Sequence, residues 1–323
     1  MEINHWLLGG EPWIAYRARL DLLHEHPGSS EVVDAYERML ADPQIQGLLT
    51  ELKDWPGEAL KSHKKAGHLL HQLVFIADLG LNTDHPPVAA LMDKLFSQAS
   101  EEGPFQIVVN LPKQFGGSGE DELSWMLCDS GSTLYAAAKL GGIEDPHIIK
   151  AADTLAGLAR EETGWPCAAT EALGKFKGPG KREDPCPYAN LLMVKALLPF
   201  GERYRDQIDM GAWTLLRLWE KRISQKPFLF AMGTHFSKLK APLVWYDLLH
   251  VMDVLSQIPE ICDEKPVQEM AEIIERKGDP EGRFMAESIW MDWRAWEFGQ
   301  KREPSRWVTF LARRILDRIN QTP

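Results

Sequence analysis

The sequence has no long hydrophobic run, and none of its apolar stretches approaches the roughly 18 residues that a membrane span requires. Residues 1–20 lack a basic segment followed by a long apolar core, so we expect no signal peptide. Cysteine is scarce, with four residues in 323 and no CxxC pair, and a chain of this length can bury a core without disulfides. No segment alternates with period two over a useful length, so strands are not expected. These absences favour a reduced, cytoplasmic protein.

Positive charge is also in short supply, because 36 Lys and Arg face 47 Asp and Glu, for a net charge of -11. This balance argues against nucleic acid as a partner, since a phosphate backbone needs a basic face. A small anion can still bind where cations are concentrated locally. Such a concentration exists in GKFKGPGKREDPCPY, residues 174–188, which includes Lys175, Lys177, Lys181 and Arg182.

A repeat of about 60 residues runs through the chain. Aromatic residues that end similar segments are separated by 60, 63 and 56 residues, at Phe105, Trp165, Phe228 and Phe284. An amphipathic run precedes each of them, and a more apolar run precedes that one. Six apolar runs are present, at 12–23, 63–81, 128–142, 186–201, 243–259 and 305–319. Five amphipathic runs alternate with them, at 31–42, 86–99, 146–159, 208–221 and 266–276.

Helix pairs at this period either stack as an open solenoid or close into a ring. We predict an all-α protein, an α/α toroid of about six inner and five outer helices in a single domain over residues 1–323, with an open α-solenoid as the alternative. Long loops would link each outer helix to the next inner helix, at 106–127, 166–185, 229–242 and 285–304. They would gather beside the N-terminal ends of the inner helices, which favour anions.

Two stretches combine residues that can bind a metal. Asp184 and Cys186 open one apolar run, and Asp247 and His250 lie in the next one. A thiolate, a carboxylate and a third ligand from Asp247 or His250 would form a zinc site with an open fourth position. The alternative is that the cysteine only packs in the core. Cys128 and Asp129 begin the preceding apolar run and either join the site or only cap that helix.

Other polar residues interrupt the apolar runs at helical spacing. Tyr246, His250 and Asp253 follow i, i+4, i+7 spacing, and His68 and His71 share a face in the same way. Polar groups on an inner helix must face a cavity or be paired, because burying them alone is unfavourable.

The repeat resembles that of terpenoid cyclases and protein prenyltransferase β-subunits. In the prenyltransferases an Asp-x-Cys-Tyr-type segment supplies two zinc ligands, and Asp184 and Cys186 match it, with Tyr188 displaced by one residue. Lys181 lies where the family has a diphosphate-binding lysine. Two departures stand out: Asp247 falls where the family has a histidine ligand, and the Asp-x-Asp-Asp acid of the cyclases is absent. The chain is similar to a divergent, stand-alone, bacterial-type member.

This resemblance implies a protein that binds an isoprenoid diphosphate or a similar anionic, apolar small molecule, with zinc as a cofactor for a transferase step. The residues expected to bind the ligand are Lys177, Lys181, Arg182, Tyr188, Lys238 and Trp245. Those expected to be catalytic are Tyr246, Asp247 and His250. Two other classes stay open: a carbohydrate-active hydrolase or lyase that uses its tryptophans as platforms, and a non-catalytic ligand- or peptide-binding toroid.

Overall fold

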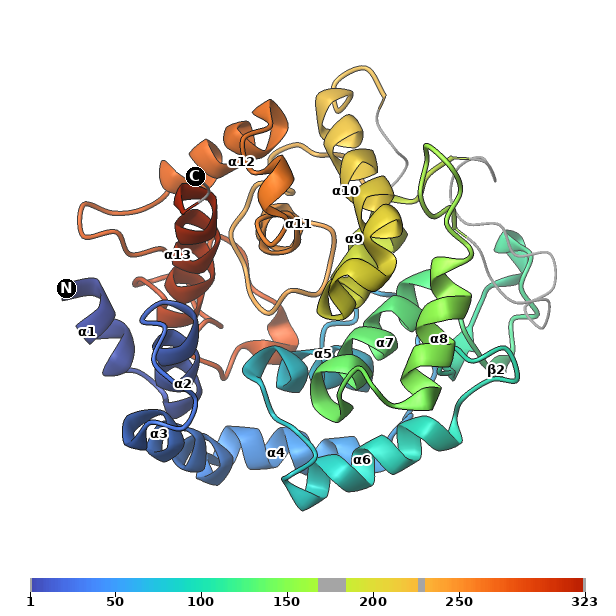
Figure 1. Ribbon diagram of the computed structural model, residues 1–323, viewed down its shortest axis with the longest axis horizontal. Helices are drawn as coiled ribbons and strands as arrows, with labels where there is room; N and C mark the ends of the chain where they lie inside the picture. Colours follow the sequence, from blue (N-terminus) through green and yellow to red (C-terminus); the bar gives the residue numbers. More distant parts are fainter. Residues whose placement is uncertain (1, 168–183, 226–229, 322–323) are drawn as a thin grey trace. The chain divides into compact units, whose positions relative to one another are not determined.

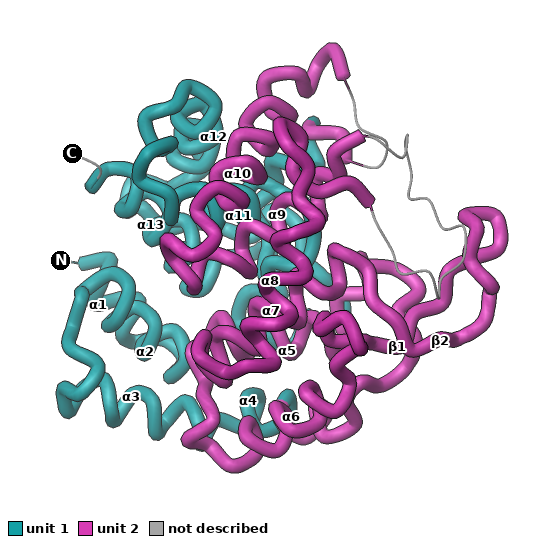
Figure 2. The backbone as a smooth tube through the Cα atoms, turned by 45° about the vertical axis from the view of Figure 1, so that its right-hand side comes forward, with its two compact units in different colours: residues 1–48, 233–323 teal, residues 49–232 magenta. Residues whose placement is uncertain are grey.

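The computed structural model describes residues 2–167, 184–225 and 230–321 of the chain. Within these residues the regular structure is helical apart from one short hairpin, so the prediction of an all-α protein is confirmed. The chain divides into two compact units, coloured separately in Figure 2. Unit 1 contains residues 1–48 and 233–323, and unit 2 contains residues 49–232. The single domain, the toroid and the solenoid all depend on how these units are joined, and they stay predictions.

Unit 2 contains three of the predicted helix pairs. Its α-helices are α5 (Leu69–Leu79), α6 (Pro86–Ser97), α7 (Leu127–Gly141), α8 (Pro146–Ala156), α9 (Pro187–Leu197) and α10 (Arg205–Glu220). The apolar helices form a row in which α7 packs between α5 and α9. The amphipathic helices cover this row, since α6 and α8 contact α7 and α10 contacts α9 (Figure 1). All eleven residues of α9 are buried, as expected of a helix in an inner layer.

Unit 1 repeats this arrangement with the two ends of the chain. Its α-helices are α1 (Glu2–Leu8), α2 (Pro12–Asp21), α3 (Ser30–Ala41), α11 (Leu248–Leu255), α12 (Lys265–Glu275) and α13 (Arg306–Asn320). The apolar helix α13 packs against both α2 and α11, with α3 on α2 and α12 on α11. Helix α4 (Pro43–Glu51) crosses the boundary between the units, and neither it nor α1 was predicted. No helix in the described part of the chain is long and apolar enough to cross a membrane.

Two four-residue strands correct the expectation that the chain has none. β1 (Ile107–Asn110) and β2 (Asp121–Ser124) form an antiparallel hairpin inside the predicted loop 106–127. Ile107 and Val109 are buried, so β1 does alternate, but over too few residues to be distinguished from a loop. Short 3₁₀ helices complete the connections: η1 (Leu52–Asp54), η2 (Lys113–Phe115), η4 (Leu198–Tyr204), η5 (Pro259–Ile261) and η6 (Met291–Trp293).

The start of α11 also differs from the prediction. The apolar run begins at residue 243, but the helix begins only at Leu248, because the side chain of Asp247 caps it by accepting a hydrogen bond from the backbone N–H of His250 at 3.2 Å. Tyr246 therefore precedes the helix and does not share a helical face with His250 and Asp253. The helix itself is wholly buried, with all eight residues inside unit 1.

Candidate metal centre

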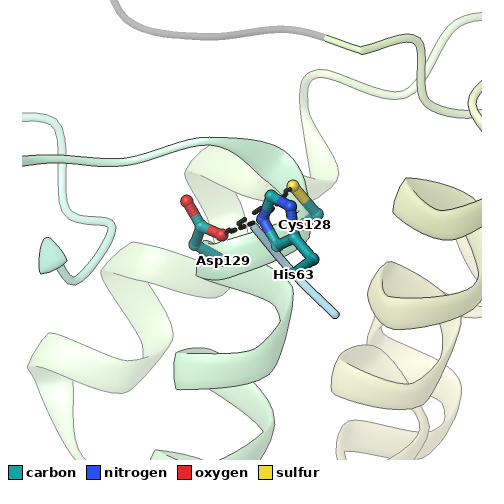
Figure 3. Close-up of side chains that lie close together, drawn as sticks. All are labelled: His63, Cys128 and Asp129. Carbon is teal, nitrogen blue, oxygen red and sulfur yellow. Dashed lines mark hydrogen bonds and ion pairs between the residues drawn. The ribbon is translucent and has the colours of Figure 1, made fainter. Parts of the chain in front are cut away.

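Three side chains of unit 2 converge at the N-terminal ends of two neighbouring inner helices. His63 lies in the segment before α5, and Cys128 and Asp129 are the second and third residues of α7. Figure 3 shows that the imidazole Nε2 of His63 points at both partners. It lies 3.0 Å from the sulfur of Cys128 and in hydrogen-bond contact with Oδ1 of Asp129. The three donor atoms lie within 4.8 Å of one another, so this group could hold a metal ion.

The carboxyl group of Asp129 is the most deeply placed part of this cluster. Its side chain has no solvent exposure, whereas the ring of His63 is 21% exposed. Its second oxygen, Oδ2, is buried and has no hydrogen-bond partner among the described residues. A buried carboxylate oxygen in this state is unfavourable unless a cation or donor reaches it. Oδ2 of Asp129 therefore keeps an acceptor position that a cation could use.

The charge states of the cluster follow from its burial. Burial raises the pKa of the Cys128 thiol to about 11, although the neighbouring His63 opposes this shift. For His63, burial lowers the pKa, but the negative charges and hydrogen bonds of Cys128 and Asp129 outweigh it and hold the pKa well above its usual value. To bind a metal ion, both groups must therefore give up a proton, because the ligand forms are thiolate and neutral imidazole.

A second histidine, His71, holds the segment that carries His63 through a hydrogen bond. His71 on α5 donates its Nε2–H to the backbone carbonyl of His63 at 3.0 Å. Burial lowers the pKa of His71 to about 3, so its ring stays neutral. His68 instead caps α5, accepting from the backbone N–H of Leu70 at 3.1 Å. His68 and His71, which the spacing places on a shared face, therefore both bond to backbone groups and lie outside the cluster of His63, Cys128 and Asp129.

A pair of thiols, Cys167 and Cys186, lies near the start of the next inner helix, α9. Cys186 caps α9 and accepts the backbone N–H of Ala189 at 3.5 Å. The thiol of Cys167 donates a hydrogen bond to it, which is the main reason why the pKa of Cys186 falls to about 7 while that of Cys167 is raised. The charge of Cys186 interacts with His63 and Cys128, so the two groups are neighbours. Tyr188 adds an edge-on contact to the ring of His63, with ring centres 5.8 Å apart.

The predicted metal ligands fall into different units. Asp184 and Cys186 belong to unit 2, and Asp247 and His250 to unit 1, so their joining in one site stays a prediction. In unit 1 the Asp247 carboxylate lies 3.5 Å from the amine of Lys240, and burial raises its pKa to about 6. The ring Nδ1 of His250 lies 3.1 Å from the carbonyl of Trp245. The group that the structure brings together, His63, Cys128 and Asp129, contains none of these four residues.

The predicted ligand-binding and catalytic residues are likewise distributed. Lys177, Lys181 and Arg182 lie outside the described residues. In unit 1, Lys238 and Trp245 are half-buried, whereas Tyr246 is buried and packs against Phe236 with ring centres 5.4 Å apart. In unit 2, Tyr188 is 2% exposed and lies beside the cluster.

His63 is the functional residue that the sequence analysis missed. The signal that could have found the region is the repeat itself, because Cys128 and Cys186 are 58 residues apart and begin neighbouring inner helices. His63 begins the predicted apolar run 63–81 as Cys128 and Cys186 begin theirs, but the helix starts only at Leu69, so His63 lies in the connection before α5. Fold and site together define a class: an all-α protein of paired helices with a candidate metal centre where inner helices begin. Comparison with known proteins finds no matching family model and no significantly similar curated protein.

Proposed function

We propose that the chain is a zinc-dependent enzyme of the transferase type that acts on an anionic, largely apolar small molecule. The observation that carries this proposal is the convergence of His63, Cys128 and Asp129, with a buried Asp129 oxygen that has no partner among the described residues. Imidazole nitrogen, thiolate sulfur and carboxylate oxygen are the donors that zinc prefers. Three protein ligands leave a fourth position for substrate, as in catalytic zinc sites.

The residues present fit such an ion in chemistry as well as in position. The buried negative charges of Asp129 and of a deprotonated Cys128 need a cation to compensate them. When bound, zinc would polarise a substrate or favour its deprotonated thiol. His71 would hold the ligand His63 in place through its carbonyl, and Tyr188 would cover one edge of the ring.

An isoprenoid diphosphate is the substrate class that we propose first. Its anionic head would be favoured by the N-terminal ends of α7 and α9, where the backbone N–H groups and helix dipole attract negative charge. The cations Lys177, Lys181 and Arg182 precede the start of α9 at Pro187 in the sequence. The apolar tail is proposed from the resemblance of the repeat to terpenoid cyclases and prenyltransferases.

The tryptophans give less support to a carbohydrate-active enzyme. Trp125, Trp165 and Trp293 are 6%, 0% and 3% exposed, so they cannot offer a face to a sugar ring in this structure. Trp13 and Trp296 pack edge-on at 5.5 Å, within a cluster of aromatic side chains. A non-catalytic binding protein differs from the proposal in needing no metal, and the first experiment separates the two.

The first experiment measures zinc in the purified chain by mass spectrometry after zinc is supplied and the excess is removed. We expect about one zinc per chain, and at least about 100-fold weaker binding in Cys128→Ala and His63→Ala, since even outer-shell partners change affinity 10–100-fold. Cys262→Ala is the matched control, because Cys262 is also a buried thiol but donates to the carbonyl of Ile258 at 3.4 Å and is not one of the three clustered residues. Wild-type protein that takes up no zinc, or a Cys128→Ala variant that keeps it while folded by circular dichroism, would refute the metal centre.

The second experiment measures binding of farnesyl diphosphate by calorimetry. We expect Lys181→Ala to weaken binding about 10–100-fold, because a charge-assisted contact contributes about 1.5–3 kcal/mol. Lys265→Ala is the control, since this lysine is 86% exposed on α12. Farnesol binding as tightly as its diphosphate, or Lys181→Ala binding like the wild type, would contradict the anion site while leaving the metal result intact.

A further inference from the structure

The side chains of two cysteines outside the three-residue cluster form a hydrogen bond with each other. Cys167 and Cys186 lie on segments joined by an antiparallel bridge between Pro166 and Pro185. The backbone N–H of Cys186 also donates to the carbonyl of Trp165 at 2.9 Å, which fixes one segment against the other. The thiol of Cys167 donates a hydrogen bond to the sulfur of Cys186. Both are free thiols, and both residues are partly exposed.

The two sulfurs are not equivalent. Cys186 accepts the Cys167 thiol hydrogen bond and the backbone N–H groups of Tyr188 and Ala189 at the start of α9. A thiolate at a helix N-terminus is stabilised by these donors, and the thiolate is the nucleophilic form of cysteine. Cys167 is the hydrogen-bond donor of the pair and keeps its proton. This geometry gives Cys186 the role of attacking thiol and Cys167 that of resolving thiol.

We propose that Cys167 and Cys186 are a redox-active dithiol that a hydroperoxide converts to a disulfide. In the first step the Cys186 thiolate attacks a peroxide oxygen, the O–O bond breaks, and hydroxide leaves and is protonated to water. In the second step the Cys167 sulfur attacks the resulting sulfenic acid, the S–S bond forms, and the oxygen leaves with a proton as a second water. Two thiols and one hydrogen peroxide thus give one disulfide and two waters.

The reaction needs no metal, so it goes beyond the proposed function and does not depend on it. It does bear on the candidate centre, because the charge of Cys186 interacts with His63 and Cys128. A disulfide is uncharged, and its formation removes that charge from beside the cluster. The dithiol would thereby link the oxidation state of the chain to the electrostatics of the metal site.

The test oxidises the reduced full-length chain with hydrogen peroxide in the presence of a chelator, so that bound metal does not protect the thiols. We expect free thiols to fall from four to two per chain. Tryptic digestion should then yield a cross-link between the peptides carrying Cys167 and Cys186, which are separated by cleavage sites at Lys175, Lys177, Lys181 and Arg182. Zinc content, measured separately on the reduced chain, reports on the proposed function alone.

Two variants make the assignment specific. Cys262→Ala should form the same cross-link at the same rate, because Cys262 is buried and its thiol donates to the carbonyl of Ile258 at 3.4 Å. Cys167→Ser should form no disulfide and should instead accumulate a sulfenic acid on Cys186 that dimedone labels. Thiols that stay at four after peroxide treatment, or a cross-link between Cys128 and Cys186, would overturn the proposal.

Discussion

The Asp253→Ala variant is expected to lose about 3–5 kcal/mol of unfolding free energy, because it breaks a buried ion pair on one side only. Asp253 on α11 is 4% exposed, and its Oδ1 accepts hydrogen bonds from Arg314 at 2.7 Å and Arg318 at 3.2 Å. Arg314, itself 7% exposed, also reaches Asp21 on α2 at 2.9 Å. Removing the carboxylate leaves the buried guanidinium of Arg314 under-compensated inside unit 1 and takes one acceptor from the half-buried Arg318, which keeps the Asp253 carbonyl.

Urea unfolding measures this loss as a shift in midpoint at constant slope. Asp253→Asn is the informative control, since it keeps an acceptor oxygen and the side-chain volume but removes the charge, and a smaller loss is expected. Glu272→Ala on α12 should stay within about 0.5 kcal/mol of the wild type, because its 2.7 Å pair with Arg276 lies at the exposed surface. A loss below about 1 kcal/mol for Asp253→Ala would show that the arginines find other partners or water.

Asp253 also shows what the hydrophobic pattern of the sequence can predict and what it cannot. The sequence indicates that a polar strip on an inner helix must face a cavity or be paired, and for Asp253 the structure shows pairing. Its partners are about 60 residues away on α13, and no local pattern identifies them. The helix pairs, by contrast, were predictable, because the apolar period and the Pro residues near the helix starts are both local signals. The hairpin was not, since its strands have four residues each.

The candidate metal centre was likewise only partly predictable from the sequence. Cys128 and Cys186 occupy equivalent places in the repeat, so the sequence could place both at the starts of inner helices. Their proximity depends on how closely α7 and α9 pack. Gly131 allows this approach, because a Cβ atom there would lie 3.0 Å from Cβ of Leu192. His63 also begins a predicted apolar run, but α5 starts six residues later, at Leu69, so the contact of His63 with Cys128 depends on the path of the connection before α5.

One buried amide joins the segments of Trp165 and Cys186, and Asn190→Leu is expected to lose about 3–5 kcal/mol of unfolding free energy. Oδ1 of Asn190 accepts the backbone N–H of Trp165 at 3.1 Å. Its Nδ2 donates to the carbonyl of Trp165 at 2.8 Å and to that of Cys186 at 2.9 Å. Leucine offers none of these bonds and leaves the Trp165 N–H buried. Gly164 fits the same design, since a Cβ there would lie 2.0 Å from Oδ1 of Asn190.

Because Asn190 joins the segments of Cys167 and Cys186, the substitution should also change their chemistry. We expect peroxide to form the disulfide at least about tenfold more slowly in Asn190→Leu, since losing the fixed orientation of two reacting groups reduces their effective concentration. Asn190→Asp keeps the acceptor for Trp165 but turns a buried carboxylate oxygen toward the carbonyls of Trp165 and Cys186, so it should be at least as unstable as Asn190→Leu. Thiol loss timed by alkylation and mass spectrometry, at a temperature where each variant is folded, measures the rate. An Asn190→Leu chain that is destabilised yet oxidises as fast as the wild type would show that the amide supports the fold without orienting the sulfurs.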